Sequence, residues 1–158
     1  MDLARQILLG TTVFGICAAV HVALVAISIP LLTNLAAFSM SRFHRLHVFL
    51  LLGVAFAVMV FAHTVQVWVW ALVFIWLEAL PDMETSLYFA MATYTTLGYG
   101  DIVLDPGFRI FASFASVTGL LTFGISTAFL MGVITRVFRE DRAAARRNAL
   151  YRGPGNTS

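Results

Sequence analysis

The chain has 158 residues, of which 60% are hydrophobic and 11% charged, and its formal net charge is +2. Soluble domains carry about 25% charged residues, so this composition argues against a water-soluble globule and predicts a membrane protein. The single cysteine, Cys17, excludes an intrachain disulfide framework, and we expect it to be a small buried residue.

Three apolar stretches, at residues 7–32, 46–77 and 108–138, exceed the roughly 20 residues that a transmembrane helix needs. A fourth, at residues 83–95, is too short to cross, because a helix of that length spans about 20 Å, two-thirds of the hydrocarbon core. Its length suits a re-entrant segment shielded by protein. We therefore predict an all-α membrane protein with three transmembrane helices and a re-entrant helix.

The charges segregate along the chain and predict its orientation. Arg42 and Arg45 lie in the first loop, and six arginines lie between Arg136 and Arg152. The segment from residue 78 to residue 107 has no basic residue and contains Glu78, Asp82, Glu84, Asp101 and Asp105. Positive-inside bias places the first loop and the tail in the cytoplasm and the acidic segment outside. Three spans then put the N-terminus outside and the C-terminus in the cytoplasm.

Residues 1–45 form an extra N-terminal transmembrane helix and a cytoplasmic loop. The helix lacks arginine at every third position, which argues against a voltage sensor. Pro30 lies near its inner end, where we expect the helix to stop. We expect the helix to pack on the outside of the remaining spans.

The second span, residues 46–77, carries Trp68, Trp70 and Trp76 toward its outer end, which predicts an aromatic belt at the outer interface. His63 and Gln66 lie deep in this span, where polar side chains usually face protein.

His21 and His63 each lie 14 residues from the outer end of their span, so we expect them at similar depth. Two interpretations stay open. Each imidazole is neutral and bonds to a neighbouring helix, or the two make a proton-sensitive contact that ties the extra helix to the second span.

The short apolar stretch begins with a helix-start signal. Asp82 is a candidate N-cap, and Glu84 lies in the first turn, where the helix dipole favours negative charge. The helix that follows should run inward, with its partly negative C-terminal end favouring a cation.

The residues that follow this helix, Thr95-Thr96-Leu97-Gly98-Tyr99-Gly100-Asp101, carry the main functional signal. Glycines at alternate positions allow dihedrals of alternating hand, so that successive carbonyls point the same way. One column of carbonyls cannot surround an ion, but several copies about an axis can replace its hydration shell. The segment therefore implies an oligomer.

This heptapeptide resembles the TTVGYGD signature of the tetrameric potassium-channel family, with Leu97 in place of valine. The resemblance covers roughly residues 46–138, which would be the pore domain, and implies a homotetramer. It assigns K⁺ coordination to the carbonyls of Thr96, Leu97, Gly98 and Tyr99 and to the Thr96 hydroxyl. It assigns support of the filter to Thr95, Gly100, Asp101 and Tyr94.

The family resemblance also implies an aromatic surround for the filter from Tyr88, Phe89 and Tyr94. Some bacterial relatives have a glutamate at the position of Ala92, bonded to the aspartate that corresponds to Asp101. That pairing is absent from this sequence.

Residues 118–128 resemble the inner helix of bacterial two-helix potassium channels. By this resemblance Gly119 is a gating hinge, with Gly124 a second candidate, and Thr127 and Met131 line the inner cavity. Packing alone is the alternative for these glycines. Gly124, Ala128 and Gly132 recur every four residues, which allows close helix contact in lipid.

Residues 139–158 form a short basic tail that we expect to continue as a helix until Gly153-Pro154-Gly155. The sequence shows no nucleotide, metal or catalytic constellation. We therefore expect no enzyme activity, no cofactor other than the permeating K⁺, no nucleic acid and no small-molecule substrate.

The sequence thus predicts a passive potassium channel of the cell membrane, assembled as a homotetramer in the lipid bilayer. A weakly selective cation channel is the nearest alternative. A bis-histidine haem electron carrier belongs to a different class, and a subunit that modulates other channel chains is a third alternative.

Overall fold

The computed structural model describes residues 1–37 and 44–151, with side chains for residues 1–35, 46 and 48–139. The elements are α1 (Leu3–Ala37), α2 (His44–Trp76), α3 (Met83–Tyr94), the short 3₁₀ helix η1 (Pro106–Phe108) and α4 (Arg109–Tyr151). Over these described ranges the chain is helical, without strands. The predicted fold class is confirmed in its helical part.

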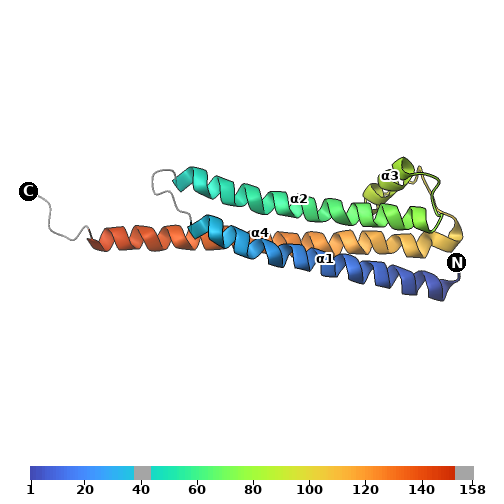
Figure 1. Ribbon diagram of the computed structural model, residues 1–158, viewed down its shortest axis with the longest axis horizontal. Helices are drawn as coiled ribbons and strands as arrows, with labels where there is room; N and C mark the ends of the chain where they lie inside the picture. Colours follow the sequence, from blue (N-terminus) through green and yellow to red (C-terminus); the bar gives the residue numbers. More distant parts are fainter. Residues whose placement is uncertain (38–43, 152–158) are drawn as a thin grey trace, which may run out of the picture.

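The three long helices lie side by side, and α3 lies against α2 and α4 at the end of the bundle that carries the N-terminus (Figure 1). Each long helix contains a segment long and apolar enough to cross a membrane: Leu3–Leu35, Val48–Trp76 and Pro106–Arg139. Their outer faces expose many large apolar side chains, as expected for surfaces in contact with lipid or with other chains. The protein is therefore a membrane protein with three candidate spans.

The first helix was expected to stop near Pro30, but it does not. It continues to Ala37, so the proline lies inside α1. A proline removes one backbone hydrogen bond, but the turn beyond it packs well: Leu32 is buried against Leu51 and Val137. This tertiary packing outweighs the local preference to end the helix.

A large apolar core joins the four helices at the α3 end of the bundle. Its fully buried members include Trp70, Phe74 and Phe111, whose rings contact one another, and the predicted buried Cys17. The prediction of Trp70 as an interfacial belt residue is therefore wrong. Trp68 and Trp76, on the other side of α2, are exposed, as the belt requires.

The pore helix α3 begins as predicted. The Asp82 side chain accepts hydrogen bonds from the backbone N–H of Thr85 at 2.8 Å and from its hydroxyl at 2.9 Å. The first of these bonds is the N-cap interaction, which satisfies an N–H group without a partner inside the helix.

The start of α4 is held by α1. The side-chain oxygen of Gln6 accepts hydrogen bonds from the backbone N–H groups of Ile110 and Phe111, at 3.1 and 3.3 Å. These N–H groups lie in the first turn of α4, where no partner exists inside the helix. Gln6 therefore caps α4 from a helix about 100 residues earlier in the chain.

The other end of α4 runs on to Tyr151, so the first part of the predicted tail is helical, as expected. Arg42, the predicted tail end at Gly153-Pro154-Gly155 and the side chain of Arg45 lie outside the described part of the chain.

Candidate ion pathway

The backbone of the segment after α3 alternates in hand. Thr96, Gly98 and Gly100 have φ angles of +61°, +53° and +79°, at every second position. This is the alternation that lets successive carbonyls point to one side. It extends to one residue, Thr96, that is not a glycine.

The same segment terminates the pore helix. Thr96 N–H donates to the carbonyl of Thr93 at 3.0 Å, and Leu97 N–H donates to that of Ala92 at 2.8 Å. These two bonds form a Schellman motif, in which the left-handed position is usually glycine. A left-handed conformation costs a non-glycine residue about 1–2 kcal/mol. Thr96 therefore carries strain directly after the end of α3.

Residues 95–101 are exposed in a single chain. Leu97 is 53% exposed and Tyr99 70%, although both side chains are large and the segment follows a buried helix end. Exposed apolar surface of this kind marks an interaction site. The rest of a single chain therefore does not cover this segment.

The outer end of the segment is tied back to the pore helix. The Tyr88 hydroxyl donates a hydrogen bond to the Asp101 carboxylate at 2.5 Å. This bond lowers the pKa of Asp101 and raises that of Tyr88, because it favours the ionised carboxylate and the protonated phenol. The bond therefore keeps the Asp101 carboxylate ionised, and it fits the predicted supporting role of Asp101.

The other two rings of the predicted aromatic surround contact the core. Phe89 packs edge-on against Phe74, and Tyr94 packs against Phe123 on α4. Within one chain, Tyr88 is thus the ring of the three that bonds to the filter segment.

The inner helix approaches the end of the pore helix closely. Ser116 donates a hydrogen bond to the carbonyl of Thr93 at 2.8 Å. A Cβ built on Gly119 would overlap the carbonyl oxygen of Tyr94. Gly119 therefore has a packing role in this structure, and its role as a hinge stays a prediction.

The other predicted positions of the inner helix lie on an uncovered face of α4. A Cβ added at Gly124 would meet nothing within 4 Å, and Thr127 and Met131 are exposed. This face is free to contact other chains or to line a cavity between them.

His21 and His63 are in contact. The rings of His21 and His63 lie 5.2 Å apart between centroids, and the Nε2 atoms lie 3.1 and 3.0 Å from the same hydroxyl, Oγ of Ser126. The predicted common depth and the hypothesis of a contact are confirmed. Each histidine also bonds to neighbouring helices, as the first interpretation required.

All four ring nitrogens of these histidines have hydrogen-bond partners: Ser126 for both Nε2 atoms, Gln66 and Tyr94 for the Nδ1 atoms. No nitrogen is left to ligate iron, which weighs against the bis-histidine haem alternative. Sequence reasoning missed Ser126 and Tyr94 as partners, because a serine and a tyrosine among apolar residues carry no signal of which helix they face.

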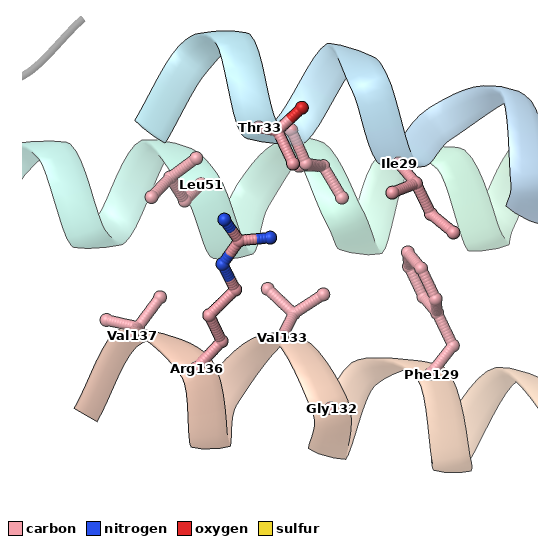
Figure 2. A pocket seen from close by; sticks show the side chains of 9 residues that line it. Ile29, Thr33, Leu51, Phe129, Gly132, Val133, Arg136 and Val137 are labelled. Carbon is pink, nitrogen blue, oxygen red and sulfur yellow. The ribbon is translucent and has the colours of Figure 1, made fainter. Parts of the chain in front are cut away.

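A cavity of about 240 Å³ lies far from the filter, between α1, α2 and α4. Figure 2 shows the side chain of Arg136 extending from α4 toward Thr33 and Leu51 on the opposite side of this cavity. The rest of the lining is apolar: Ile29, Leu32, Phe129, Gly132, Val133 and Val137. A second cavity, of about 330 Å³, lies beside α3 and reaches His63 and Thr95.

Comparison with known proteins identifies the region that contains these features. Residues 62–136 match the family model described as "Ion channel". This part of the chain is similar to ion-channel domains. It includes the pore helix, the filter segment and most of the apolar part of α4, and it begins one residue before His63.

Relatives among curated proteins agree with this assignment. The A-type voltage-gated potassium channel KCND3 of Rattus norvegicus, and that of Oryctolagus cuniculus and of Homo sapiens, are each 29% identical to this chain over 69 residues. The match covers 43% of this chain and 10% of each relative, so the chain spans about a tenth of the length of these proteins. No solved structure matches the chain.

Proposed function

We propose that four copies of this chain form a potassium-selective channel in which the carbonyls of Thr96, Leu97, Gly98 and Tyr99 coordinate the ion. The observation that carries the proposal is the alternation of positive φ angles at Thr96, Gly98 and Gly100 within a TTLGYGD sequence. Rings of such carbonyls replace the hydration shell of K⁺. The similarity to potassium channels named KCND3 supports the choice of ion.

The uncovered filter segment and the uncovered face of α4 support the tetramer. Both would be enclosed when identical chains surround one axis, with Leu97 and Tyr99 packed between subunits and Thr127 and Met131 facing the cavity. Each subunit would then contact the next through two different patches, and four identical contacts of this kind close into a ring.

The charge pattern supports the orientation. The filter, the acidic loop and the N-terminus share one end of the bundle, and the arginine-rich end of α4 lies at the other (Figure 1). We place the filter at the extracellular side of the cell membrane and the end of α4 in the cytoplasm.

The test is ion flux from liposomes that contain this chain alone. We expect K⁺ efflux to exceed Na⁺ efflux by at least about a hundredfold, since four carbonyl rings act together. Equal fluxes would favour the weakly selective cation channel. Absence of flux from the chain alone would favour a modulatory subunit.

A matched pair of glycine substitutions locates the pathway. Gly98→Ala places a side chain at a φ of +53° and should abolish K⁺ flux, because alanine disfavours this conformation. Gly53→Ala, in the middle of α2, has nothing within 4 Å of the new Cβ and should leave K⁺ flux unchanged. Equal behaviour of the two variants would contradict the assignment of the filter.

A further inference from the structure

Five polar side chains form a closed ring of hydrogen bonds in the centre of the bundle. They come from all four helices and are buried, apart from the half-buried His63: His21, His63, Gln66, Tyr94 and Ser126. Beyond the two bonds to Ser126, His63 Nδ1 lies 2.8 Å from the Tyr94 hydroxyl. That hydroxyl donates to Gln66 Oε1 at 3.2 Å, and Gln66 Nε2 lies 2.6 Å from His21 Nδ1. We call this set the polar ring.

Hydrogen-bond chemistry allows one continuous direction around the polar ring. The amide nitrogen of Gln66 can only donate, so His21 Nδ1 accepts and its Nε2–H donates to Ser126. The Ser126 hydroxyl then donates to His63 Nε2, which leaves His63 Nδ1–H to donate to Tyr94. The Tyr94 hydroxyl donates to Gln66 Oε1 and closes the circuit. In this arrangement each member donates one bond along the ring and accepts one, Thr122 donates to the Tyr94 hydroxyl, and both imidazoles are neutral.

Through Tyr94, the polar ring contacts the end of the pore helix, just before the filter segment, and the inner helix α4. Tyr94 is the last residue of the pore helix, two residues before the strained Thr96. Its hydroxyl also lies 2.7 Å from Thr122 Oγ1 on α4, and its backbone carbonyl contacts Gly119. The orientation of Tyr94 therefore sets where the filter segment starts.

His21 is the member that comes from outside the region similar to ion-channel domains. It lies on α1, before the matched residues 62–136, and it is fully buried. Without it, Gln66 and Ser126 would each lose a buried partner, which costs more than the net gain of making such a bond.

We propose that His21 is a positioning residue for ion selectivity: through the polar ring, the extra helix α1 fixes Tyr94 and thereby the start of the filter. This inference rests on the proposed channel function. It gives α1 a part in conduction rather than only in packing.

The polar ring also has no place for an added proton. A second N–H on His21 would face the donating amide of Gln66, and one on His63 would force the Ser126 hydroxyl proton to turn away from it. The titratable groups that face the imidazoles are each other and Tyr94, with the thiol of Cys17 nearby on α1. Among the described side chains no carboxylate or arginine bonds to either imidazole. Acid should therefore open the polar ring.

The test compares two substitutions on α1. His21→Leu breaks the polar ring, and Gln6→Met breaks the α1–α4 cap about four turns away. Both should lower thermal stability in detergent. We expect His21→Leu to reduce the K⁺/Na⁺ flux ratio at least about tenfold, whereas Gln6→Met leaves the ratio unchanged. An unchanged ratio in His21→Leu would overturn the inference.

A double-substitution cycle tests whether the ring transmits the effect. His21 and Tyr94 do not bond to each other, so coupling between them must pass through Gln66 or through Ser126 and His63. Tyr94→Phe added to His21→Leu should reduce the flux ratio little further, because either change opens the same circuit. Fully additive effects would overturn the inference.

Two further measurements separate this inference from simple failure to fold. If His21→Leu does not assemble, His21→Gln, which keeps a donor toward Ser126, decides in its place. We expect a smaller fall in the flux ratio, and an unchanged ratio would overturn the inference. The wild-type flux ratio should fall as the pH is lowered from 7 to about 4, and the variant His21→Gln/His63→Gln should lose this dependence. A wild-type chain without selective K⁺ flux would instead contradict the proposed function, and stability coupling between His21 and Tyr94 would still test the ring.

Discussion

The hydroxyl of Tyr88 ties the pore helix to the outer end of the filter segment through Asp101. The bond lowers the pKa of Asp101, so it is present above the ordinary aspartate pKa of about 3.9 and is lost as the pH falls through the lowered value. It also raises the pKa of Tyr88, so the phenol keeps its proton at neutral pH. The hydrogen bond between Tyr88 and Asp101 should therefore persist over the whole physiological pH range.

Removing this hydroxyl should weaken the filter mouth. We expect K⁺ current in Tyr88→Phe to decay several-fold faster during sustained conduction, because Asp101 loses its partner. Recordings in planar bilayers at neutral outer pH would measure the decay. Asp101→Asn, which keeps an acceptor but no charge, should give an intermediate decay. Identical decay in wild type and Tyr88→Phe would show that the bond does not brace the filter.

At the same scale, single residues show what the sequence could and could not predict. Asp82 was predictable as a cap, because the signal is local. Trp70 was predicted wrongly, although the sequence held a warning: residues 68 and 70 lie about 200° apart around a helix, so both cannot face lipid. The contact of His21 with His63 followed from equal depth, but Ser126 and Tyr94 depend on helix rotation, which no local pattern gives.

Two helices of this fold end in the same way, with a left-handed residue that is not glycine. At the end of α2, Glu78 has a φ of +53°, Glu78 N–H donates to the carbonyl of Ile75 at 2.8 Å, and Ala79 N–H donates to that of Phe74 at 2.9 Å. This is again a Schellman motif without its usual glycine. The sequence therefore carried no signal for either ending.

This ending offers a stabilising substitution. Glu78→Gly removes the steric cost of the left-handed conformation, and after the entropic cost of glycine we expect a gain of about 1 kcal/mol in the free energy of unfolding. Unfolding titrations in mixed micelles would measure it. Glu78→Ala removes the charge but keeps the Cβ and should give no such gain. Equal gains from both changes would mean that charge, not backbone conformation, is the cause.

The packing of α4 against α3 gives the opposite prediction. Gly119→Ala forces a methyl group into the carbonyl of Tyr94, and overpacking of this kind costs about 1–3 kcal/mol. Gly15→Ala on α1, where nothing lies within 4 Å, should not destabilise the protein. Thermal unfolding of the purified protein in detergent compares the two. A Gly119→Ala variant as stable as Gly15→Ala would contradict the described packing.

For the whole molecule, the lengths and order of the apolar stretches predicted the helices and the short pore helix to within a few residues at most ends. The contacts within one chain do not determine how several chains are arranged around a common axis. It rests on what a single chain leaves uncovered: the filter segment with Leu97 and Tyr99, and the face of α4 with Thr127 and Met131.

The central claim is that identical filter strands from four chains turn their carbonyls toward one axis. The most direct measurement is the structure of the protein in lipid, determined with Tl⁺ replacing K⁺ so that ion positions are identified by anomalous scattering. The account predicts four chains and a row of ion peaks on the axis between the levels of Thr96 and Tyr99. A monomer, or a tetramer whose axis carries no ion at these levels, would contradict it.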